Sequence, residues 1–397
     1  MNFNFSHQAE KFRSELREFV KNELPEDYIS LYGDDEHYDD HWALAMKTAR
    51  KLGQKGWLTV SWPKEYGGMG ATFEEQVVFN YEVGYWGIPG AGMGIGGTAW
   101  VGPTLMIYGS DEQKKKHLPD IASGSEDGVW CTGYSEPDSG SDLASLQTYA
   151  QRQGDNYLLN GQKIWTSAAH RSRWCWLAAR TDREAPKKHH GISLFILDMN
   201  SPGVEVKPVI NILGHHHFNE IFMNNVELGQ ENLVGAEGQG WEVIMKALSF
   251  ERSIGVRYGA KLKRILDELK RFAIQHNLLG NAHIKHSLVT LDLEIEALIL
   301  CSCETAWKIS RGERIIYEPS RDKANLDGLV KRLATFGTEM IGPYSQMLPS
   351  NRKSRWRKLK GVVENLYWSG PAINTAGGTT NTMRNIVAKY GLRVSAE

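Results

Sequence analysis

A short segment near the middle of the chain combines hydroxyl side chains with residues that favour turns. It spans 134–142, directly after a strand expected over 129–134, and holds Ser135, Ser139 and Ser141 among Pro, Asp and Gly residues. Turns of this composition leave backbone N–H groups free to bind a ligand. Such a loop suits an acceptor-rich group, such as the pyrimidine edge of a flavin or a phosphate. On the residues alone, an ordinary surface turn is the more common explanation of such a cluster.

A second segment, 160–167, reads Asn-Gly-Gln-Lys-Ile-Trp-Thr-Ser and ends an expected strand. Trp165 and Ser167 lie two residues apart in it. These two residues fit equally well as a core tryptophan and an edge serine of a sheet, or as a ring contact and a hydroxyl donor for a planar ligand.

Taken together, the two segments resemble the signatures of the acyl-CoA dehydrogenase family. The family pattern Thr/Ser-Glu-Pro-x-Ala/Ser-Gly-Ser-Asp is matched by residues 135–142, and the pattern Asn-Gly-x-Lys-x-Trp-x-Thr/Ser is matched by residues 160–167. The resemblance covers most of the chain and is strongest over 109–252. It implies an enzyme that binds FAD.

The resemblance also implies which residues contact FAD. Tyr134 and Ser135 would face the flavin pyrimidine, and Ser141 would lie beside a phosphate of FAD or of coenzyme A. Trp165 would pack against the flavin ring, and the Ser167 hydroxyl would approach flavin N5. A donor near N5 stabilises the negative charge that arrives with a hydride.

Near the C-terminus, Thr379 and Asn381 match the family residues that contact the adenosine half of FAD. Two other family segments that serve this half are not intact. These are Arg-x-x-Phe-Gly, sought around Arg271, and Gln-x-x-Gly-Gly, sought around Met347. Either this half of FAD binds differently, or a non-identical partner subunit supplies those groups.

The reaction implied by the resemblance is the introduction of an α,β double bond into an acyl-CoA, which requires a base for the α proton. Many family members take this base from a C-terminal Glu-Gly-Thr motif, but the matching position here is Gly377, which cannot act as a base. A subset uses a glutamate just after the β domain, and Glu251 matches it. We expect Glu251 to be the catalytic base and Arg252 to shape or charge the acyl-CoA site. A solvated Glu–Arg pair is the alternative.

Within the family, the chain looks nearest to members that act on bulky, branched or alicyclic acyl-CoAs, including steroid side-chain dehydrogenases. Segments 132–137, 165–170 and 218–220 carry this likeness. The resemblance implies a role in β-oxidation, an electron-transfer flavoprotein as acceptor, and a homotetramer or a heterotetramer with a related subunit. Two alternatives remain: a catalytically silent or partner-dependent subunit of a heteromeric complex, and a flavin oxidase or monooxygenase on the same fold.

Apolar periodicity divides the 397 residues into three parts. Helical spacing dominates 1–127, short strands separated by turn residues fill 128–236, and helical spacing returns over 237–397. We expect a multidomain α+β fold with an N-terminal helical domain, a middle antiparallel β domain and a C-terminal helical bundle, with FAD between the last two. Asn160 and Gly161 predict a hairpin turn inside the β domain.

Composition and residue spacing argue against several other classes of protein and site. A net charge of −1 argues against binding to nucleic acid or to a membrane surface. No apolar run reaches transmembrane length and the first residues lack a signal pattern, so no membrane insertion is expected. The four cysteines have no disulfide or zinc spacing, which favours a reducing cytoplasm. The histidine runs lack metal-ligand spacing, so no metal site is expected.

Overall fold

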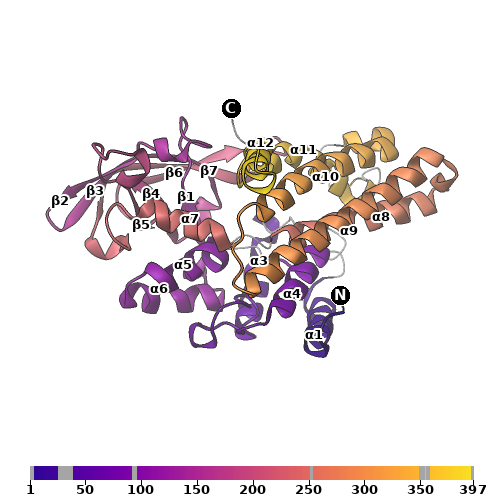
Figure 1. Cartoon of the computed structure of the whole chain (residues 1–397), viewed down its shortest axis with the longest axis horizontal. Coiled ribbons are helices and arrows are strands. Elements are labelled where there is room, and N and C mark those ends of the chain that lie inside the picture. The colour runs from indigo at the N-terminus through magenta and orange to yellow at the C-terminus, as the bar shows by residue number, and fades with distance from the viewer. Residues whose placement is uncertain are drawn as a thin grey trace.

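A computed structural model describes residues 4–25, 39–91, 96–250, 254–347, 354 and 358–394 of the chain. In Figure 1 the later helices of the N-terminal third lie below a β-sheet and the earlier ones lie below the long C-terminal helices, which extend away from the sheet to the right. This succession of helices, sheet and helices confirms the predicted fold class.

The N-terminal part contains the α-helices α1 (His7–Glu23), α3 (Asp39–Gln54), α4 (Phe73–Trp86), α5 (Gly102–Tyr108) and α6 (Asp111–Ser123). Side-chain caps begin α1, α4 and α6. At α4, the Thr72 hydroxyl accepts a hydrogen bond from the Glu75 N–H (3.3 Å), and the Glu75 carboxylate accepts one from the Thr72 N–H (2.8 Å). Ser110 and Gln113 repeat this capping box at α6. The caps satisfy N–H groups that a first helical turn leaves unpaired.

The middle part forms one eight-stranded sheet in the order β6-β7-β3-β2-β4-β5-β8, with β1 paired to β4. The strands are β1 (Trp130–Gly133), β2 (Tyr149–Gln153), β3 (Asn156–Ser167), β4 (Trp174–Arg180), β5 (Ile192–Asp198), β6 (Val204–Ile210), β7 (His216–Leu228) and β8 (Leu233–Val234). β4 pairs in parallel with β1 and β2, and the other pairings are antiparallel. The sheet is therefore mainly antiparallel, as predicted.

Both faces of the sheet are buried around β4. On one face, Trp176 packs with Leu105 of α5 and Ile121 of α6, and α7 (Gly240–Phe250) completes this core. On the opposite face, Leu177 packs with Phe195 in a second core within the sheet. β4 is consequently buried at every position, whereas β6 at the sheet edge has no buried residue.

The hairpin turn predicted at Asn160 and Gly161 is wrong, because β3 continues through both residues. A register shift against β7 marks a β-bulge at this point. Gly161 has φ 150°, and a Cβ atom there would lie 2.6 Å from the Thr148 hydroxyl. The Asn160 amide bridges the bulge, donating to the Asn225 side-chain oxygen (3.2 Å) and accepting from the Asn225 N–H (2.9 Å). The Asn-Gly pair thus bends a continuous strand.

Long helices make up the C-terminal part. They are α8 (Ile254–Gln275), α9 (Ala282–Ser310), α10 (Glu318–Ile341), α11 (Val362–Thr375) and the short α12 (Thr380–Ile386). Apolar residues such as Leu266, Leu298 and Leu333 form their common core. α4 packs tightly on α8: a Cβ atom at Gly84 would lie 2.0 Å from the carbonyl oxygen of Arg257. A glycine at this crossing therefore joins the N-terminal helices to the bundle.

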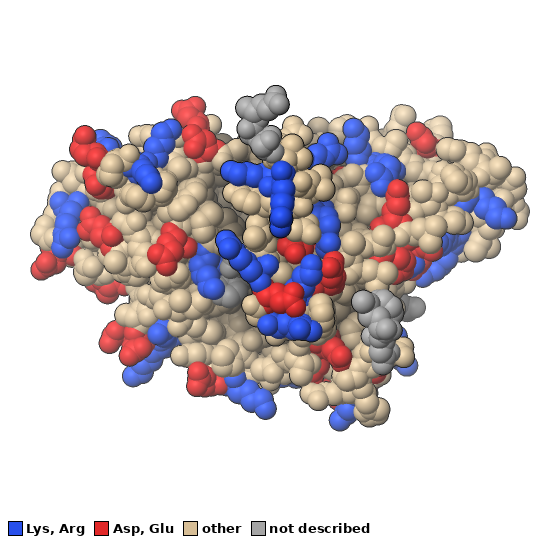
Figure 2. Space-filling model, in the orientation of Figure 1, with Lys and Arg blue, Asp and Glu red and all other residues tan. Residues whose placement is uncertain are grey.

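Acidic and basic side chains are interspersed over the face that Figure 2 presents, in keeping with the near-zero net charge. None of the helices that the structure describes is long and apolar enough to span a membrane.

Candidate active site

The 134–142 loop begins where β1 ends, and a buried ion pair holds its first residues. Lys163 Nζ of β3 donates to a Glu136 carboxylate oxygen (2.8 Å) and to the carbonyl oxygen of Tyr134 (3.1 Å). The Glu136 carboxylate also accepts hydrogen bonds from the N–H groups of Gln147 (2.6 Å) and Thr148 (2.9 Å). One carboxylate and one ammonium group thereby connect the two segments that resemble the family signatures.

Burial and charge act in opposite directions on this pair. Lys163 is completely buried and Glu136 is 8% exposed. Burial opposes ionisation of Glu136, but the Lys163 charge and the hydrogen bonds to the carboxylate hold its pKa below the ordinary value. Burial also lowers the pKa of Lys163, an effect that the Glu136 charge opposes. We treat both groups as ionised, because each partner satisfies the other with additional hydrogen bonds around them.

A second buried cation holds the far end of the loop. Arg180 of β4 donates to the carbonyl oxygens of Ala144 (2.7 Å), Leu146 (3.1 Å) and Lys188 (2.8 Å). Since Arg180 is only 7% exposed, these carbonyl groups replace the water that its guanidinium would otherwise bind. The loop between these two cations, which includes Ser135 to Ser141, is therefore fixed at both ends.

β3 runs beside this loop and changes direction at Trp165. The Ile164 N–H donates to the carbonyl oxygen of Ser135 (2.9 Å), which joins the strand to the loop. Trp165 and Ala168 both have left-handed backbones, with φ 60° and 54°. Residues with side chains rarely adopt this conformation, and such strain is found most often at functional sites. The Trp165 side chain is 58% exposed, with Phe218 at its edge (5.9 Å between ring centroids).

The side chains in this region fit the flavin that the sequence predicts. Within the described part of the chain, the hydroxyls of Ser135, Ser141 and Ser167 make no hydrogen bond to protein. A flavin pyrimidine edge and a phosphate both offer the acceptors that such hydroxyls require. The exposed indole of Trp165 offers a flat apolar face for a ring. The structure thus brings Tyr134, Ser135, Trp165 and Ser167 into one region, with Ser141 on the same loop.

The predicted C-terminal residues lie at the start of α12, which packs on α10 of the bundle (Figure 1). Thr379 caps this helix by accepting from the Thr382 N–H (3.2 Å), and Asn381 follows in its first turn. Asp327 of α10, 1% exposed, accepts from the Thr380 hydroxyl (2.6 Å) and so fixes the segment to the bundle.

Gly377, just before α12, has a left-handed backbone (φ 68°) and no side chain to act as a base. The residues predicted in its place, Glu251 and Arg252, lie outside the described part of the chain. The described residues on either side are Phe250, the last of α7, and Ile254, the first of α8.

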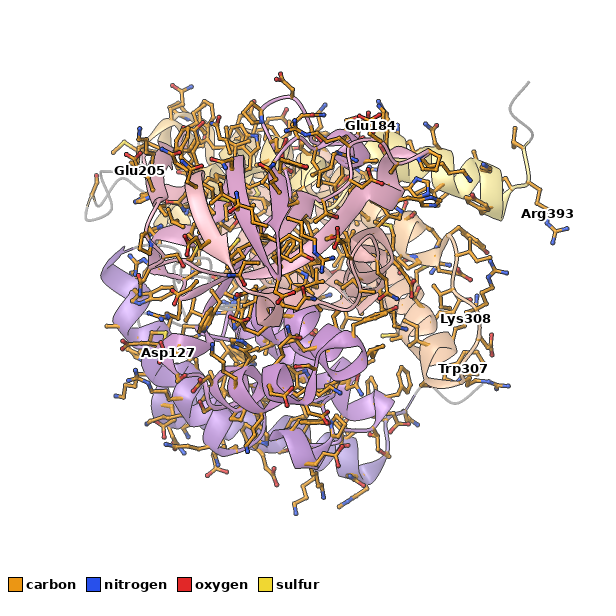
Figure 3. All side chains as sticks on the ribbon, turned by 90° about the vertical axis from the view of Figure 1, so that its left-hand side faces the viewer. Asp127, Glu184, Glu205, Trp307, Lys308 and Arg393 are labelled. Atoms are coloured by element: carbon orange, nitrogen blue, oxygen red, sulfur yellow. The ribbon has the colours of Figure 1, made fainter. Side chains whose placement is uncertain are left out.

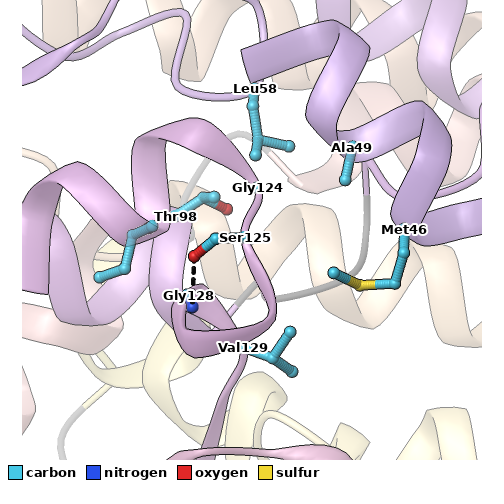
Figure 4. Close-up of a pocket in the computed structure, with 9 residues that line it drawn as sticks. Met46, Ala49, Leu58, Thr98, Gly124, Ser125, Gly128 and Val129 are labelled. Carbon is cyan, nitrogen blue, oxygen red and sulfur yellow. Dashed lines mark hydrogen bonds between the residues drawn. The ribbon is translucent and has the colours of Figure 1, made fainter. Parts of the chain in front are cut away.

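A cavity of about 10 Å³ lies among the N-terminal helices, lined by Met46, Leu58 and Thr98, with Ser125 accepting from the Gly128 N–H (3.2 Å) at its wall (Figure 4). This volume corresponds to a single water molecule. It cannot hold an acyl group.

Sequence reasoning missed Glu136, Lys163 and Arg180 as residues that position the site. Glu136 and Lys163 stand inside the matched patterns, so the signal was a charged residue of unexplained purpose in each pattern. Arg180 ends the apolar run 174–179 and gave no comparable signal, because its carbonyl partners depend on loop paths.

Comparison with known proteins decides the family. Three family models match the chain. They are described as "Acyl-CoA dehydrogenase, N-terminal domain" (residues 6–125), "Acyl-CoA dehydrogenase, middle domain" (residues 131–226) and "Acyl-CoA dehydrogenase, C-terminal domain" (residues 238–392). The chain belongs to the acyl-CoA dehydrogenase family. This acyl-CoA dehydrogenase is a flavoprotein oxidoreductase, and tetramers are typical of its family.

Individual relatives match over the full length of the chain. The acyl-CoA dehydrogenases FadE29 and IpdE1 of Mycobacterium tuberculosis (strain ATCC 25618 / H37Rv) are 33% and 30% identical, over 99% and 98% of both chains. Two solved structures are each 30% identical to this chain, and each alignment covers 100% of both chains. They are the Tcur3481-Tcur3483 steroid ACAD (TM-score 0.88) and the ChsE4-ChsE5 complex from Mycobacterium tuberculosis (TM-score 0.87).

Proposed function

We propose that this acyl-CoA dehydrogenase uses FAD to introduce an α,β double bond into the acyl group of a bulky, branched or alicyclic acyl-CoA. The observation that carries the proposal is the region where the 134–142 loop meets β3. There, serine hydroxyls without a protein partner and the exposed indole of Trp165 lie on two segments that a backbone hydrogen bond from Ile164 to Ser135 joins, in a chain of this family. Bound FAD supplies a hydride acceptor at N5, and we assign the Ser167 hydroxyl to that atom and Tyr134 and Ser135 to the pyrimidine.

We assign the α proton of the substrate to Glu251. The C-terminal position that carries a glutamate in many family members is Gly377, whose backbone is left-handed and which has no side chain. A carboxylate in a site that excludes water is suited to removing a proton next to a thioester carbonyl. Arg252, the next residue, would contact the acyl-CoA, and Ser141 would lie beside a phosphate.

The names of similar proteins support the proposed substrate class. One similar solved structure is called a steroid ACAD, and its alignment with this chain covers 100% of both chains. We therefore expect a polycyclic or branched acyl group rather than a short straight chain.

The similar solved structures also favour a heteromeric assembly, since two of them are named as pairs of chains. The family segments sought around Arg271 and Met347 for the adenosine half of FAD are not intact, which supports contributions from a related subunit. Thr379 and Asn381 would provide this chain's own contacts. We expect an electron-transfer flavoprotein as the acceptor and, given four unpaired cysteines, a cytoplasmic location.

A visible spectrum tests the proposal directly. The protein is expressed alone and with candidate partner subunits, and then titrated anaerobically with short, long, aromatic and alicyclic acyl-CoAs. We expect a flavin spectrum that one bulky class bleaches. A chain that stays colourless with added FAD in every combination would instead be a silent subunit, and rapid reoxidation by oxygen alone would indicate an oxidase.

Glu251→Gln tests the assignment of the base. We predict that this variant keeps the flavin spectrum but is reduced by the bleaching acyl-CoA at least about 100-fold more slowly, because general-base catalysis contributes factors of that order. Glu242→Gln, which alters an exposed carboxylate on α7, is the matched control and should react as the wild type. Unchanged reduction of the Glu251 variant would remove Glu251 from the mechanism.

A further inference from the structure

The end of β3 leaves regular strand geometry just where it meets the flavin region. Its register against β7 shifts between Lys163 and Thr166, and the left-handed residues Trp165 and Ala168 stand on either side of Thr166 and Ser167. Such a conformation persists only when surrounding contacts determine it. These contacts come from β7.

Asn219 of β7 is the central contact. Its side chain is completely buried, and Nδ2 donates to the carbonyl oxygen of Thr166 (3.0 Å). The other end of the amide, Oδ1, lies 2.6 Å from Nε2 of His216. Because Asn219 uses its NH₂ group toward Thr166, Oδ1 must accept, and His216 must carry its proton on Nε2. The imidazole thereby fixes which way the amide faces.

The ring of His216 is held in turn from its other side. It stacks on His170 of the turn that follows β3, with 3.9 Å between ring centroids and 21° between the planes. His216 and Asn219 therefore form a short polar brace between the beginning of β7 and the end of β3.

The brace determines where Ser167 points. The Thr166 carbonyl accepts from Asn219 of β7 (3.0 Å), and in a trans peptide the C=O and the following N–H point in opposite directions. The Ser167 N–H therefore points away from β7, as does the Ile164 N–H, which reaches the carbonyl oxygen of Ser135. The Ser167 N–H thus points to the side of β3 on which the Ile164 N–H meets the 134–142 loop.

We propose that Asn219, oriented by His216, is a positioning residue for the flavin site. The Thr166 carbonyl and the Ser167 N–H belong to one planar peptide, so the bond from Asn219 that fixes the carbonyl also fixes the N–H. It holds the Ser167 N–H and hydroxyl toward the atoms around flavin N5. This inference rests on the proposed function, and it assigns a role to two residues outside both matched segments.

Asn219→Asp tests the brace with little change in shape, because it replaces the donor to Thr166 by an acceptor. His216→Phe is the second variant; it keeps a flat ring against His170 but removes the donor to the amide. The matched control is Asn160→Asp, which removes an equivalent amide at the other bulge of the same strand pair. Each protein is measured for its flavin absorption spectrum, its flavin midpoint potential and its anaerobic reduction by the acyl-CoA that bleaches the wild type.

We expect both brace variants to shift the flavin spectrum and lower the midpoint potential. We also expect about tenfold slower reduction in Asn219→Asp, with the half-saturating acyl-CoA concentration within about twofold of the wild type. The control should match the wild type in all three measurements. If Asn219→Asp does not fold, the spectrum and potential of His216→Phe decide.

Wild-type values for spectrum, potential and rate in the folded brace variants would overturn the inference while leaving the proposed function intact. A wild-type protein that binds no FAD, alone or with a partner, would overturn the proposed function first and this inference with it.

Discussion

Lys163 and Glu136 form a buried ion pair, and each group is costly to bury alone. The pair connects two segments of the candidate site. Glu136 is part of the 134–142 loop, and Lys163 lies in β3, two residues before Trp165. The pair therefore sets the distance between the hydroxyls of the loop and the indole of the strand.

We predict that Lys163→Met destabilises the protein by about 3 kcal/mol, because it leaves the Glu136 carboxylate buried without its counter-ion. The same variant should lose flavin more readily on dilution, since the loop is no longer joined to β3. Thermal unfolding and the flavin content after gel filtration measure the two effects.

The double variant Lys163→Met with Glu136→Gln separates charge from shape. It removes the unpaired charge, so we expect it to be more stable than Lys163→Met alone. A double variant less stable than the single one would mean that the charge of Glu136 does not cause the loss.

At the scale of elements, α6 is attached to the sheet through an aromatic cluster. His117 of α6 meets Trp130 of β1 and Trp174 of β4 edge to face, with centroids 5.1 Å and 4.8 Å away. Burial, assisted by the charge of Lys116, lowers the pKa of His117 to about 4. The helix is therefore docked through a neutral imidazole.

We predict that this contact weakens the fold in mildly acidic solution. His117 has an ordinary pKa of 6.5, so above that pH both folded and unfolded chains carry it neutral and the full stability is present. Between pH 6.5 and about 4 mainly the unfolded chain takes up the proton, and the free energy of unfolding falls by about 2–3 kcal/mol.

His117→Phe keeps an aromatic ring and cannot be protonated, so its melting temperature should depend less on pH in this window. His286→Phe, an exposed position on α9, should keep the wild-type dependence. Equal slopes for the wild type and His117→Phe would contradict the prediction.

The elements were more predictable from the sequence than the contacts between them. Helix starts such as Thr72 are local, because a cap needs only residues within one turn. The turn predicted at Asn160 and Gly161 was wrong because an Asn-Gly pair occurs in β-bulges as well as in turns. Only the partner strand, which contributes Asn225, distinguishes a bulge from a turn here.

In the candidate site, too, some residues could be assigned from the sequence and others could not. Serines and a tryptophan at matched positions could be found by pattern, because their types carry the chemistry. The roles of Arg180 and Asn219 could not, since each depends on a carbonyl group brought close by the folded chain. Glu251 stays a prediction that only its variant tests.

At the scale of the whole molecule, the outward face of α9 is unusually apolar. Val289, Leu293, Leu300 and Trp307 recur at helical spacing and are between 43% and 67% exposed. Figure 3 shows Trp307 at the outer edge of the helix. Isolated chains rarely expose such a row, and tetramers are typical of the family, so we infer that it lies in a contact between subunits.

We predict that Leu293→Lys shifts the assembly toward smaller species, because it places a charge in the middle of this row. Sedimentation velocity at several protein concentrations measures the effect. Ile107→Lys, which alters a similarly exposed residue of α5 (51% exposed), is the control. A tetramer unchanged by Leu293→Lys would exclude this face from the contact.

The two buried cations at the ends of the 134–142 loop hydrogen-bond to carbonyl oxygens and a carboxylate of the protein itself. The protein therefore fixes both ends of the loop, and a ligand that arrives has little chain to order, which favours tight association. We therefore expect the protein to stay folded when its cofactor leaves and to bind the cofactor again.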